Sequence, residues 1–474
     1  MDNGSKEQTP TSATRRDFIK KSAVVAGAAA VGVKSAKASK YTKNWVPAPG
    51  SVLGANDRIT VGHIGVGGQG FNAHMRTVAN ISGDGSTFHN YDHNAVQVAA
   101  CDLYEGRRAR AKDLMELART TRGASDVTTE VYEDYRELIE RQDIDAVFIG
   151  TVDHWHAQIA IDALESGKHV YCEKPMTRYL DEGFAVYDAV KRTGKKFQIG
   201  SQYCTEGKWH TAAQMIRDQM IGSLVLAQDS YMRNTPNGEW NYYGLEDGVT
   251  PDTMDWEKWL GPVQSRIDFN REHYHRWRKY YPYCAGILGD LLAHRVHPLL
   301  IATGNPEFPS RVVSLGNKQI TDATVGAEDR SVNDNTQLLA QFPSGLQMMI
   351  VGATVNEQGL GQVIRGSEGT LYFGGGAVEL RPERPFADLV DQETIENIAP
   401  GVSIPAHAAD FFDAIRNDGE TNGNIEVAMR AQTIISMAEM SDRLGEMMHF
   451  DEETRTISAG NGRPIEPITY GTLD

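Results

Sequence analysis

The chain has 474 residues and a formal net charge of −16 at pH 7. This length predicts two domains of ordinary size, and an apolar content of 40% is typical of a soluble globular protein. The acidic balance and the lack of a basic stripe argue against nucleic-acid binding, and beyond residue 40 no apolar run approaches the ~20 residues of a membrane span.

Residues 1–40 have the pattern of a targeting segment rather than of a folded element. In order, the segment contains Arg15, Arg16, Phe18, Lys20, the mildly apolar run Ala23–Val33 and the small residues Ala36-Lys37-Ala38. This pattern resembles a twin-arginine signal peptide, which implies export of the folded protein by the twin-arginine machinery to the periplasm. An amphipathic N-terminal arm is the alternative. Removal of residues 1–38 changes the formal charge to −20, because they carry seven basic and three acidic residues.

The stretch from Arg58 to Gly70 predicts a dinucleotide-binding turn, because an apolar strand leads directly into a glycine-rich sequence. The turn consists of Gly65, Val66, Gly67, Gly68, Gln69 and Gly70. Gly65 permits a tight turn, Gly67 lets the backbone approach a pyrophosphate, and Gly70 lets the next helix pack closely. Similar turns also occur without a nucleotide, so a second feature is needed.

Asp102 supplies that feature at the end of the next predicted strand, where a carboxylate can bind both ribose hydroxyls. It lies 37 positions after Gly65 rather than ~20, and we interpret the polar run 80–94 as an inserted loop. An acid at this position favours NAD over NADP, although Arg107 and Arg108 leave NADP open. The alternative role for Asp102 is to cap the following helix.

Residues 55–200 alternate short apolar runs with helix-like stretches, which predicts an N-terminal Rossmann domain with a doubly wound parallel sheet. Residues 201–400 contain several strand-like runs with local connections, which predicts an α+β substrate domain with a large, mainly antiparallel sheet. A long aromatic-rich insert, residues 233–310, interrupts that region, and loops of this length are usually functional. Residues 401–474 begin with helical patterns again. The predicted fold class is therefore α/β.

The four cysteines form no metal-binding or redox pattern. They are Cys101, Cys172, Cys204 and Cys284, all widely spaced. We expect buried free thiols, although an exported protein can pair two of them, and we predict no metal site.

A first polar cluster follows the fourth predicted strand, where an open α/β sheet binds its ligand. It contains Thr151, Asp153, His154 and His156. We expect Thr151, His154 and His156 to line the cofactor site. A loop that caps the next helix would equally explain Asp153 or His154.

A second cluster, Glu173-Lys174-Pro175, ends the fifth predicted strand. Loops there face the nicotinamide, and a desolvated lysine can exchange protons with a substrate. A surface ion pair is the alternative interpretation.

A third cluster places Asp290 and His294 four positions apart, on one face of a predicted helix. A histidine beside a carboxylate is a plausible acid/base pair. The spacing fits a metal pair or a solvated helix face equally well.

Taken together, these motifs resemble the Gfo/Idh/MocA family of oxidoreductases over essentially the whole chain beyond the signal segment. The similar stretches are the turn at Gly65–Gly70, Glu173-Lys174-Pro175, residues 255–262 and the Asp290/His294 pair. The resemblance implies NAD, or NADP, bound by the glycine turn, Asp102 and Glu173. It also implies C-terminal helices that pack back on the Rossmann domain, and a homodimer or homotetramer formed through the open sheet.

The resemblance further implies catalytic roles for three residues. Lys174 would lie beside the nicotinamide, while Asp290 and His294 would contact the reacting hydroxyl of a sugar, inositol or related polyol. The sequence departs from the family pattern at Leu292, where glycine is common, and at His297, where an acid is common. These departures leave the substrate undefined.

The family resemblance leaves three functions open. The leading expectation is an NAD-dependent carbohydrate oxidoreductase. The alternative is a redox-neutral glycosidase of the family 109 type, which oxidises the sugar transiently; those enzymes depart from the Glu-Lys-Pro motif retained here. The third is a sugar-binding protein without catalysis, against which the joint presence of Lys174, Asp290 and His294 argues.

Overall fold

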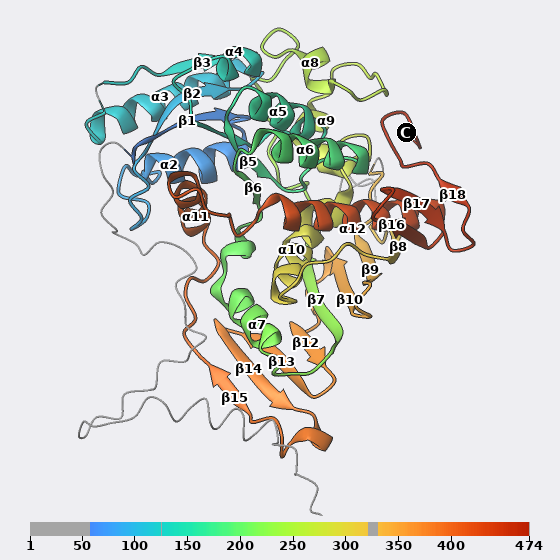
Figure 1. Ribbon diagram of the computed structural model, residues 1–474. Coiled ribbons are helices and arrows are strands. Elements are labelled where there is room, and N and C mark those ends of the chain that lie inside the picture. The colour runs from blue at the N-terminus through green and yellow to red at the C-terminus, as the bar shows by residue number, and fades with distance from the viewer. Residues whose placement is uncertain (1–56, 125, 321–329, 474) are drawn as a thin grey trace, which may run out of the picture.

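A computed structural model describes residues 57–124, 126–320 and 330–473. The predicted signal segment, residues 1–40, lies outside these ranges. The described chain forms two sheets, with a parallel sheet and its helices in the upper part of Figure 1 and a much larger sheet below. Within the described residues, no helix combines the length and apolarity that crossing a bilayer requires.

The first sheet is a six-stranded parallel sheet of order β3-β2-β1-β4-β5-β6. Its strands are β1 (Ile59–Ile64), β2 (Ala95–Cys101), β3 (Glu130–Tyr132), β4 (Ala146–Ile149), β5 (His169–Glu173) and β6 (Phe197–Gly200). Every residue of β4 and β6 is buried, as expected of strands covered on both faces. The strand order confirms the predicted Rossmann architecture.

Helices cover both faces of this parallel sheet. They are the π-helix η2 (Gly70–Met75), α2 (Arg76–Ala79), α3 (Glu105–Thr121), α4 (Tyr135–Ile139), α5 (Asp153–Glu165) and α6 (Leu180–Thr193). The glycine turn therefore leads into a π-helical rather than an α-helical first turn. The predicted loop between α2 and β2 is present and has no helix or strand of its own.

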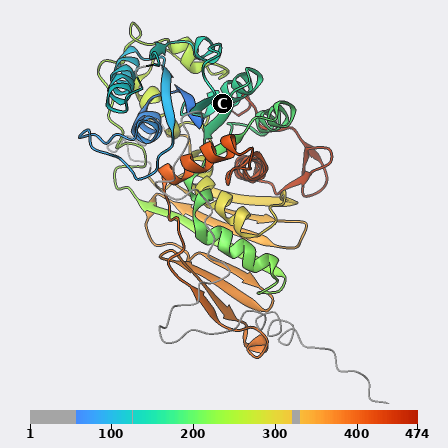
Figure 2. The ribbon, with the colours of Figure 1, turned by 60° about the vertical axis from the view of Figure 1, so that its left-hand side comes forward.

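The second sheet has twelve strands and is mostly antiparallel, with one parallel pairing between β7 and β10. Its strands in chain order are β7 (Leu224–Asn234), β8 (Arg311–Asn317), β9 (Asn335–Gln341), β10 (Gln347–Ala353), β11 (Val355–Asn356), β12 (Val363–Gly366), β13 (Gly369–Gly374), β14 (Ala377–Pro382), β15 (Glu393–Ile395), β16 (Met448–Asp451), β17 (Thr456–Ala459) and β18 (Pro464–Ile465). Figure 2 shows this sheet extending away from the Rossmann sheet. The predicted fold class is confirmed.

Three longer helices line the second sheet: α7 (Gly207–Arg217), α10 (Ala293–Ala302) and α12 (Ile425–Leu444). The aromatic insert between β7 and β8 holds α8 (Trp256–Leu260), α9 (Arg271–His275), the 3-10 helix η4 (Trp277–Lys279) and the π-helix η5 (Leu288–Leu292). Two further 3-10 helices are η3 (Gln202–Thr205) and η7 (Arg384–Phe386).

The C-terminal part of the chain returns to both sheets. Helix α11 (Ile404–Arg416) buries Phe411 and Phe412 against Val61, Phe148 and Tyr171 of the parallel sheet. The last residues differ from the helical expectation, because β16, β17 and β18 extend the second sheet at its β8 edge. The helical patterns of this region predict its helices but not these three short strands.

Candidate active site

The glycine turn is tightly packed at its base and open at its tip. Gly65 has a φ of +81°, and a Cβ there would lie 2.6 Å from the Thr151 backbone nitrogen. A Cβ on Gly70 would lie 2.0 Å from the Gly65 carbonyl oxygen, so side chains are excluded at both positions. A Cβ on Gly68 would meet nothing within 4 Å. This open tip, with free approach to the backbone, fits a dinucleotide pyrophosphate.

Glu173 ties the end of β5 to the glycine turn. Its Oε1 accepts hydrogen bonds from Gln69 Nε2 (3.1 Å) and His74 Nε2 (2.8 Å), and its Oε2 accepts from the Lys174 backbone nitrogen (3.2 Å). Burial alone would raise the pKa of Glu173, but His74, Lys174 and Gln69 outweigh it and lower the pKa to about 2. The ionised carboxylate therefore stabilises the glycine turn, which contains Gln69.

Asp102 braces the other side of the turn. Its Oδ2 accepts a hydrogen bond from the Val66 backbone nitrogen (3.0 Å), and its Oδ1 accepts from the Tyr104 backbone nitrogen (3.0 Å). Helix α3 has Tyr104 as its N-cap residue, so the N-cap alternative for Asp102 does not hold. The carboxylate lies at the tip of the turn, beside the place predicted for a ribose.

Arg107 and Arg108 are both engaged by protein groups. The Arg107 guanidinium pairs with Glu246 of the insert (2.7 Å) and stacks over Tyr274 at 4.9 Å. Arg108 donates to the carbonyl oxygens of Asp102 and Leu103. Both guanidinium groups are therefore already bonded to protein groups rather than held available for the 2′-phosphate of NADP.

The polar residues Thr151, His154 and His156, which follow β4, contact different parts of the structure. His156 bonds to the carbonyl oxygens of Pro175 (2.8 Å) and Thr151 (3.3 Å), so it supports the loop that carries Lys174. His154 bonds to the Trp259 carbonyl oxygen (2.8 Å) and faces the insert. The Thr151 Oγ1 is enclosed without a hydrogen-bond partner among the described residues and lies next to the glycine turn. Of the three, Thr151 is the side chain best placed toward a cofactor.

Lys174 and Asp290 meet although 116 positions separate them. The Lys174 Nζ donates to Oδ1 of Asp290 (2.6 Å) and to its backbone oxygen (2.6 Å). An ammonium group has three N–H donors, so one remains for another acceptor. The two side chains are 10% and 15% exposed, so the ion pair is not fully enclosed.

Two side chains of the aromatic insert complete the coordination of Asp290. Trp240 Nε1 donates to Oδ2 (3.0 Å), and Arg278 Nε donates to Oδ1 (3.1 Å). Trp240 has a φ of +67°, a backbone region that bulky residues rarely occupy and that concentrates at functional sites. No sequence pattern predicts this role for Trp240 or Arg278, since their contacts with Asp290 span 50 and 12 positions.

The charge on Asp290 is stabilised by these donors. Burial opposes ionisation, but Lys174 and Arg278, together with Trp240, hold the pKa of Asp290 well below its usual range. Arg278 stacks over the Trp277 ring at 4.1 Å, which fixes its guanidinium. Lys174 is thus paired with a permanently ionised carboxylate.

His294 lies beside this ion pair and between two tyrosines. Its ring centroid is 5.3 Å from that of Tyr203 and 6.1 Å from that of Tyr231. Burial and the Lys174 ammonium lower the pKa of His294 well below its usual value, so the imidazole is neutral. Its Nδ1 is enclosed with no hydrogen-bond partner among the described residues.

The helix that carries this pair departs from the predicted regular geometry. Asp290 belongs to the π-helical turn η5, and His294 belongs to the α-helix that follows. Single π-helical turns inside α-helices occur frequently at functional sites. The structure brings Lys174 into contact with Asp290 and places His294 four positions further along, in the α-helix that follows this irregular turn.

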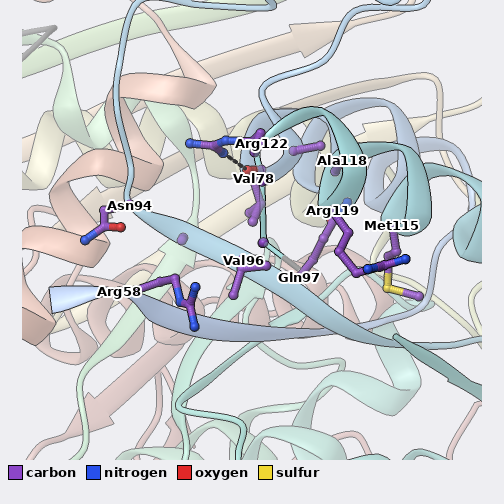
Figure 3. A pocket seen from close by; sticks show the side chains of 13 residues that line it. Arg58, Val78, Asn94, Val96, Gln97, Met115, Ala118, Arg119 and Arg122 are labelled. Atoms are coloured by element: carbon purple, nitrogen blue, oxygen red, sulfur yellow. Dashed lines mark hydrogen bonds between the residues drawn. The ribbon is translucent and has the colours of Figure 1, made fainter. Parts of the chain in front are cut away.

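A separate cavity of about 170 Å³ lies away from this site. It is lined at the amino ends of β1 and β2 by Arg58, Asn94 and Gln97, and at the end of α3 by Arg119 and Arg122 (Figure 3). Parallel sheets bind their ligands at the carboxyl ends of the strands, so this cavity is not the cofactor site.

Comparison with family descriptions assigns both halves of the chain. Residues 59–201 match the oxidoreductase family NAD-binding Rossmann fold, and residues 239–462 match the C-terminal alpha/beta domain of the same oxidoreductase family, Gfo/Idh/MocA. The first domain is therefore an NAD-binding Rossmann domain.

Similar curated proteins include a glycosyl hydrolase family 109 protein of Shewanella baltica (strain OS185) and the alpha-N-acetylgalactosaminidase of Shewanella oneidensis. Both are 29% identical over 278 residues, which is 54% of this chain and 56% of each relative. The chain thus spans about half the length of the curated relatives it matches.

Similar solved structures include a levoglucosan dehydrogenase in complex with NADH and levoglucosan, and the aldose-aldose oxidoreductase from Caulobacter crescentus complexed with glycerol. The first is 20% identical and the second 16%, each with a TM-score of 0.59. Each comparison covers 83% of this chain, with 99% of the first structure and 100% of the second. At these identities the similarity shows a shared fold.

Proposed function

The chain belongs to the Gfo/Idh/MocA oxidoreductase family, and we propose that it transfers hydride from a hydroxyl group of a sugar, inositol or related carbohydrate to NAD. The main observation behind this proposal is the part-buried ion pair between Lys174 and Asp290, with neutral His294 beside it. The named ligands of the similar structures, levoglucosan and glycerol, support a polyhydroxylated substrate.

Each residue of the site has a distinct task in this proposal. Asp290 holds the Lys174 ammonium with two hydrogen bonds, and the third N–H donates to the substrate oxygen. Neutral His294 accepts the hydrogen bond of the reacting hydroxyl, which positions its carbon for hydride loss. When bound, NAD supplies the hydride acceptor, and the open glycine turn with Asp102, Gln69 and Thr151 would hold it.

The test is NADH absorbance of the purified mature protein with NAD and a panel of free sugars, inositols and aryl glycosides. NADH that accumulates over many turnovers supports the proposal. Absence of any product across the panel contradicts it and favours the non-catalytic sugar-binding alternative.

The curated relatives favour a second candidate, a redox-neutral glycosidase. In that reaction the same site would oxidise the sugar and later reduce it, so NADH would not accumulate. The aryl glycosides in the panel separate the two candidates, because only a glycosidase releases the aryl group.

We also propose that residues 1–40 direct twin-arginine export and that the mature enzyme is periplasmic. The paired Arg15 and Arg16 support this proposal. Replacing both by lysine should retain the protein in the cytoplasmic fraction, whereas the unchanged sequence should place it in the periplasmic fraction. Equal distribution of the two proteins would contradict it.

We propose that the open face of the second sheet forms a homodimer or homotetramer. In the ladder across β8, β9 and β10, Val313 lies opposite Leu339 and Leu339 opposite Met349, and Val313 and Leu339 are exposed. A glutamate at Leu339 should shift the mass measured by light scattering toward the monomer. An unchanged mass would place the interface elsewhere.

A further inference from the structure

Arg295 carries a guanidinium group that the mechanism above does not use. It follows His294 in α10, and its Cζ lies 5.0 Å from the ring centroid of Tyr203 and 4.8 Å from that of Tyr231. The centroids of the same two rings lie 5.3 Å and 6.1 Å from that of the His294 imidazole. The guanidinium and the imidazole therefore share two aromatic neighbours, and one ligand can contact both groups.

Three elements of the fold hold the Arg295 side chain in place. Tyr203 belongs to η3, which follows β6 at the carboxyl edge of the parallel sheet, and Tyr231 belongs to β7. The Arg295 Nε donates a hydrogen bond to the backbone oxygen of Ser230, also in β7 (3.0 Å). A guanidinium that packs against two aromatic rings and is bonded at Nε has little freedom to move. A ligand that binds to it therefore loses little affinity to the ordering of this side chain.

The two terminal nitrogens of Arg295 are not used by the protein. Within the ranges that the structure describes, the one hydrogen bond of this guanidinium is made by Nε, and Nη1 and Nη2 make none. Neither nitrogen is among the fully enclosed polar atoms without a partner, and the side chain is 17% exposed. The two nitrogens together carry four N–H donors. These donors are therefore open to an incoming ligand.

Four other cations around this part of the site each have a carboxylate oxygen within 3.1 Å. The pairs are Lys174–Asp290, Arg278–Asp290, Arg233–Glu239 and Lys208–Glu206. The ion pair of Arg295 is longer, with 3.8 Å between Nε and Oδ2 of Asp229. Asp229 already accepts hydrogen bonds from Gln362 Nε2 (2.8 Å) and from the Ser230 backbone nitrogen (2.6 Å). Asp229 thus lies near Nε and leaves the two terminal nitrogens of Arg295 for another anion.

The chemistry of these free donors selects one class of ligand. A carboxylate is planar and accepts two parallel hydrogen bonds from a guanidinium, whereas a neutral hydroxyl group offers no charge to pair with it. We propose that Arg295 binds a carboxylate group of the substrate, so that the carbohydrate is a sugar acid, such as a uronic acid or its glycoside. This inference rests on the proposed function, to which it adds the substrate class.

The first test measures binding by the unchanged protein. Isothermal titration calorimetry at pH 7, with NADH present, compares D-glucuronate, D-galacturonate, D-mannuronate and their methyl glycosides with the neutral sugars of the same configuration. At least one acid should bind about 30-fold more tightly than its neutral partner, because a charge-assisted bidentate contact is gained. If no acid binds more tightly than its neutral partner, this inference is overturned.

The second test uses the acid that binds most tightly and its neutral partner. Arg295→Met keeps an apolar side chain between the two tyrosines and removes the donors. It should weaken binding of the acid about 30-fold and leave binding of the neutral sugar nearly unchanged. Arg295→Lys keeps the charge without the planar fork, so the ratio of acid to neutral affinity should fall about fivefold. The lysine variant also decides the question if Arg295→Met does not fold.

The control is Arg365→Met in β12, whose guanidinium bonds to Oε1 of Gln228 (2.8 Å). This variant should bind the acid as the unchanged protein does. A ratio of acid to neutral affinity that stays the same in the Arg295 variants, or that falls equally in Arg365→Met, overturns the inference, because Arg295 would then not contact the carboxylate.

The NADH assay on the same compounds separates failure of this inference from failure of the proposed function. NADH formed from a neutral sugar, with no acid bound more tightly, overturns the inference and leaves the proposed function in place. An acid that binds through Arg295 but gives no product overturns the proposed function and supports the carboxylate site.

Discussion

Two carboxylates, the buried Glu173 and the part-buried Asp290, are held in place by different means. Glu173 is held by the Rossmann domain itself, through Gln69, His74 and the adjacent backbone. Asp290 is held from outside its own helix, by Lys174 of the Rossmann domain and by Trp240 and Arg278 of the insert. The Glu173 carboxylate is therefore held within one domain, whereas the Asp290 carboxylate depends on contacts between domains.

Lys174 joins these two arrangements, so its loss should have the largest effect. Lys174→Ala should lower kcat about 10³-fold, or ~4 kcal/mol, because it removes the N–H donor proposed for the substrate oxygen. Nucleotide binding should persist, since Glu173 and the glycine turn keep their contacts. NADH formation and NAD affinity measured on the same preparation check this. Lys191→Ala, which removes a surface lysine paired with Glu426, serves as the control, and unchanged turnover in Lys174→Ala would contradict the assignment.

The Glu173 side of the comparison predicts acid sensitivity. The folded pKa of about 2 lies below the ordinary value of 4.5, so the ionised form stabilises the fold above pH 4.5 and the contribution is lost as the pH falls toward 2. That contribution amounts to about 3 kcal/mol. Urea unfolding at several pH values should show a steeper acid loss for the unchanged protein than for Glu173→Gln. The control Glu165→Gln removes a half-exposed surface ion pair with Arg192 and should show the same acid loss of stability as the unchanged protein. Identical pH dependence for all three proteins would show that Glu173 does not stabilise the fold in this way.

The insert side of the comparison can be tested at Arg278. Arg278→Met removes one charged donor from Asp290 and should lower kcat/KM about 30-fold, or ~2 kcal/mol, in the NADH assay. The control is Arg276→Met, two positions earlier, whose guanidinium bonds to Glu272 and the Tyr243 carbonyl oxygen. Equal losses of kcat/KM in the two variants would mean that the insert contributes only through packing and not through the contact of Arg278 with Asp290.

Trp240 should give the smallest effect. Trp240→Phe keeps the ring in place and removes only the N–H donor to Asp290, so kcat should fall about fivefold, or ~1 kcal/mol. Trp256→Phe removes a matching N–H bond, to the Ile267 carbonyl oxygen, elsewhere in the insert and should leave kcat unchanged. A larger loss in Trp256→Phe than in Trp240→Phe would reverse the assignment.

The same contrast explains which parts of the site could be predicted from the sequence. The glycine turn, Asp102, Glu173 and Lys174 all follow predicted strands of a regular sheet, so chain order alone brings them to one edge. The alternation of apolar runs and helix-like stretches could also be recognised, because the apolar runs are short and separated by polar turns.

The contacts that the insert makes with Asp290 could not be predicted from the sequence in this way. Trp240 and Arg278 reach Asp290 across 50 and 12 positions, within a segment that has few periodic patterns. Nothing in their spacing distinguishes them from the other aromatic and basic residues of the insert. The π-helical turn that carries Asp290 has no local sequence signal either, since it differs from an α-helix only by one shifted hydrogen bond. The strands β16, β17 and β18 are short and pair with a distant edge, so tertiary contacts decide them.

Because α11 packs on the parallel sheet, the Rossmann domain cannot complete its folding until a late stage of synthesis. The face formed by Val61, Phe148 and Tyr171 is covered by Phe411 and Phe412, more than 200 positions downstream of all three. While the ribosome is still making the second sheet, the nascent Rossmann domain has all its strands but an uncovered apolar face. The domain therefore completes its folding only after Arg416 has been synthesised. A fragment that ends near residue 201 would expose this apolar face and would be prone to aggregation.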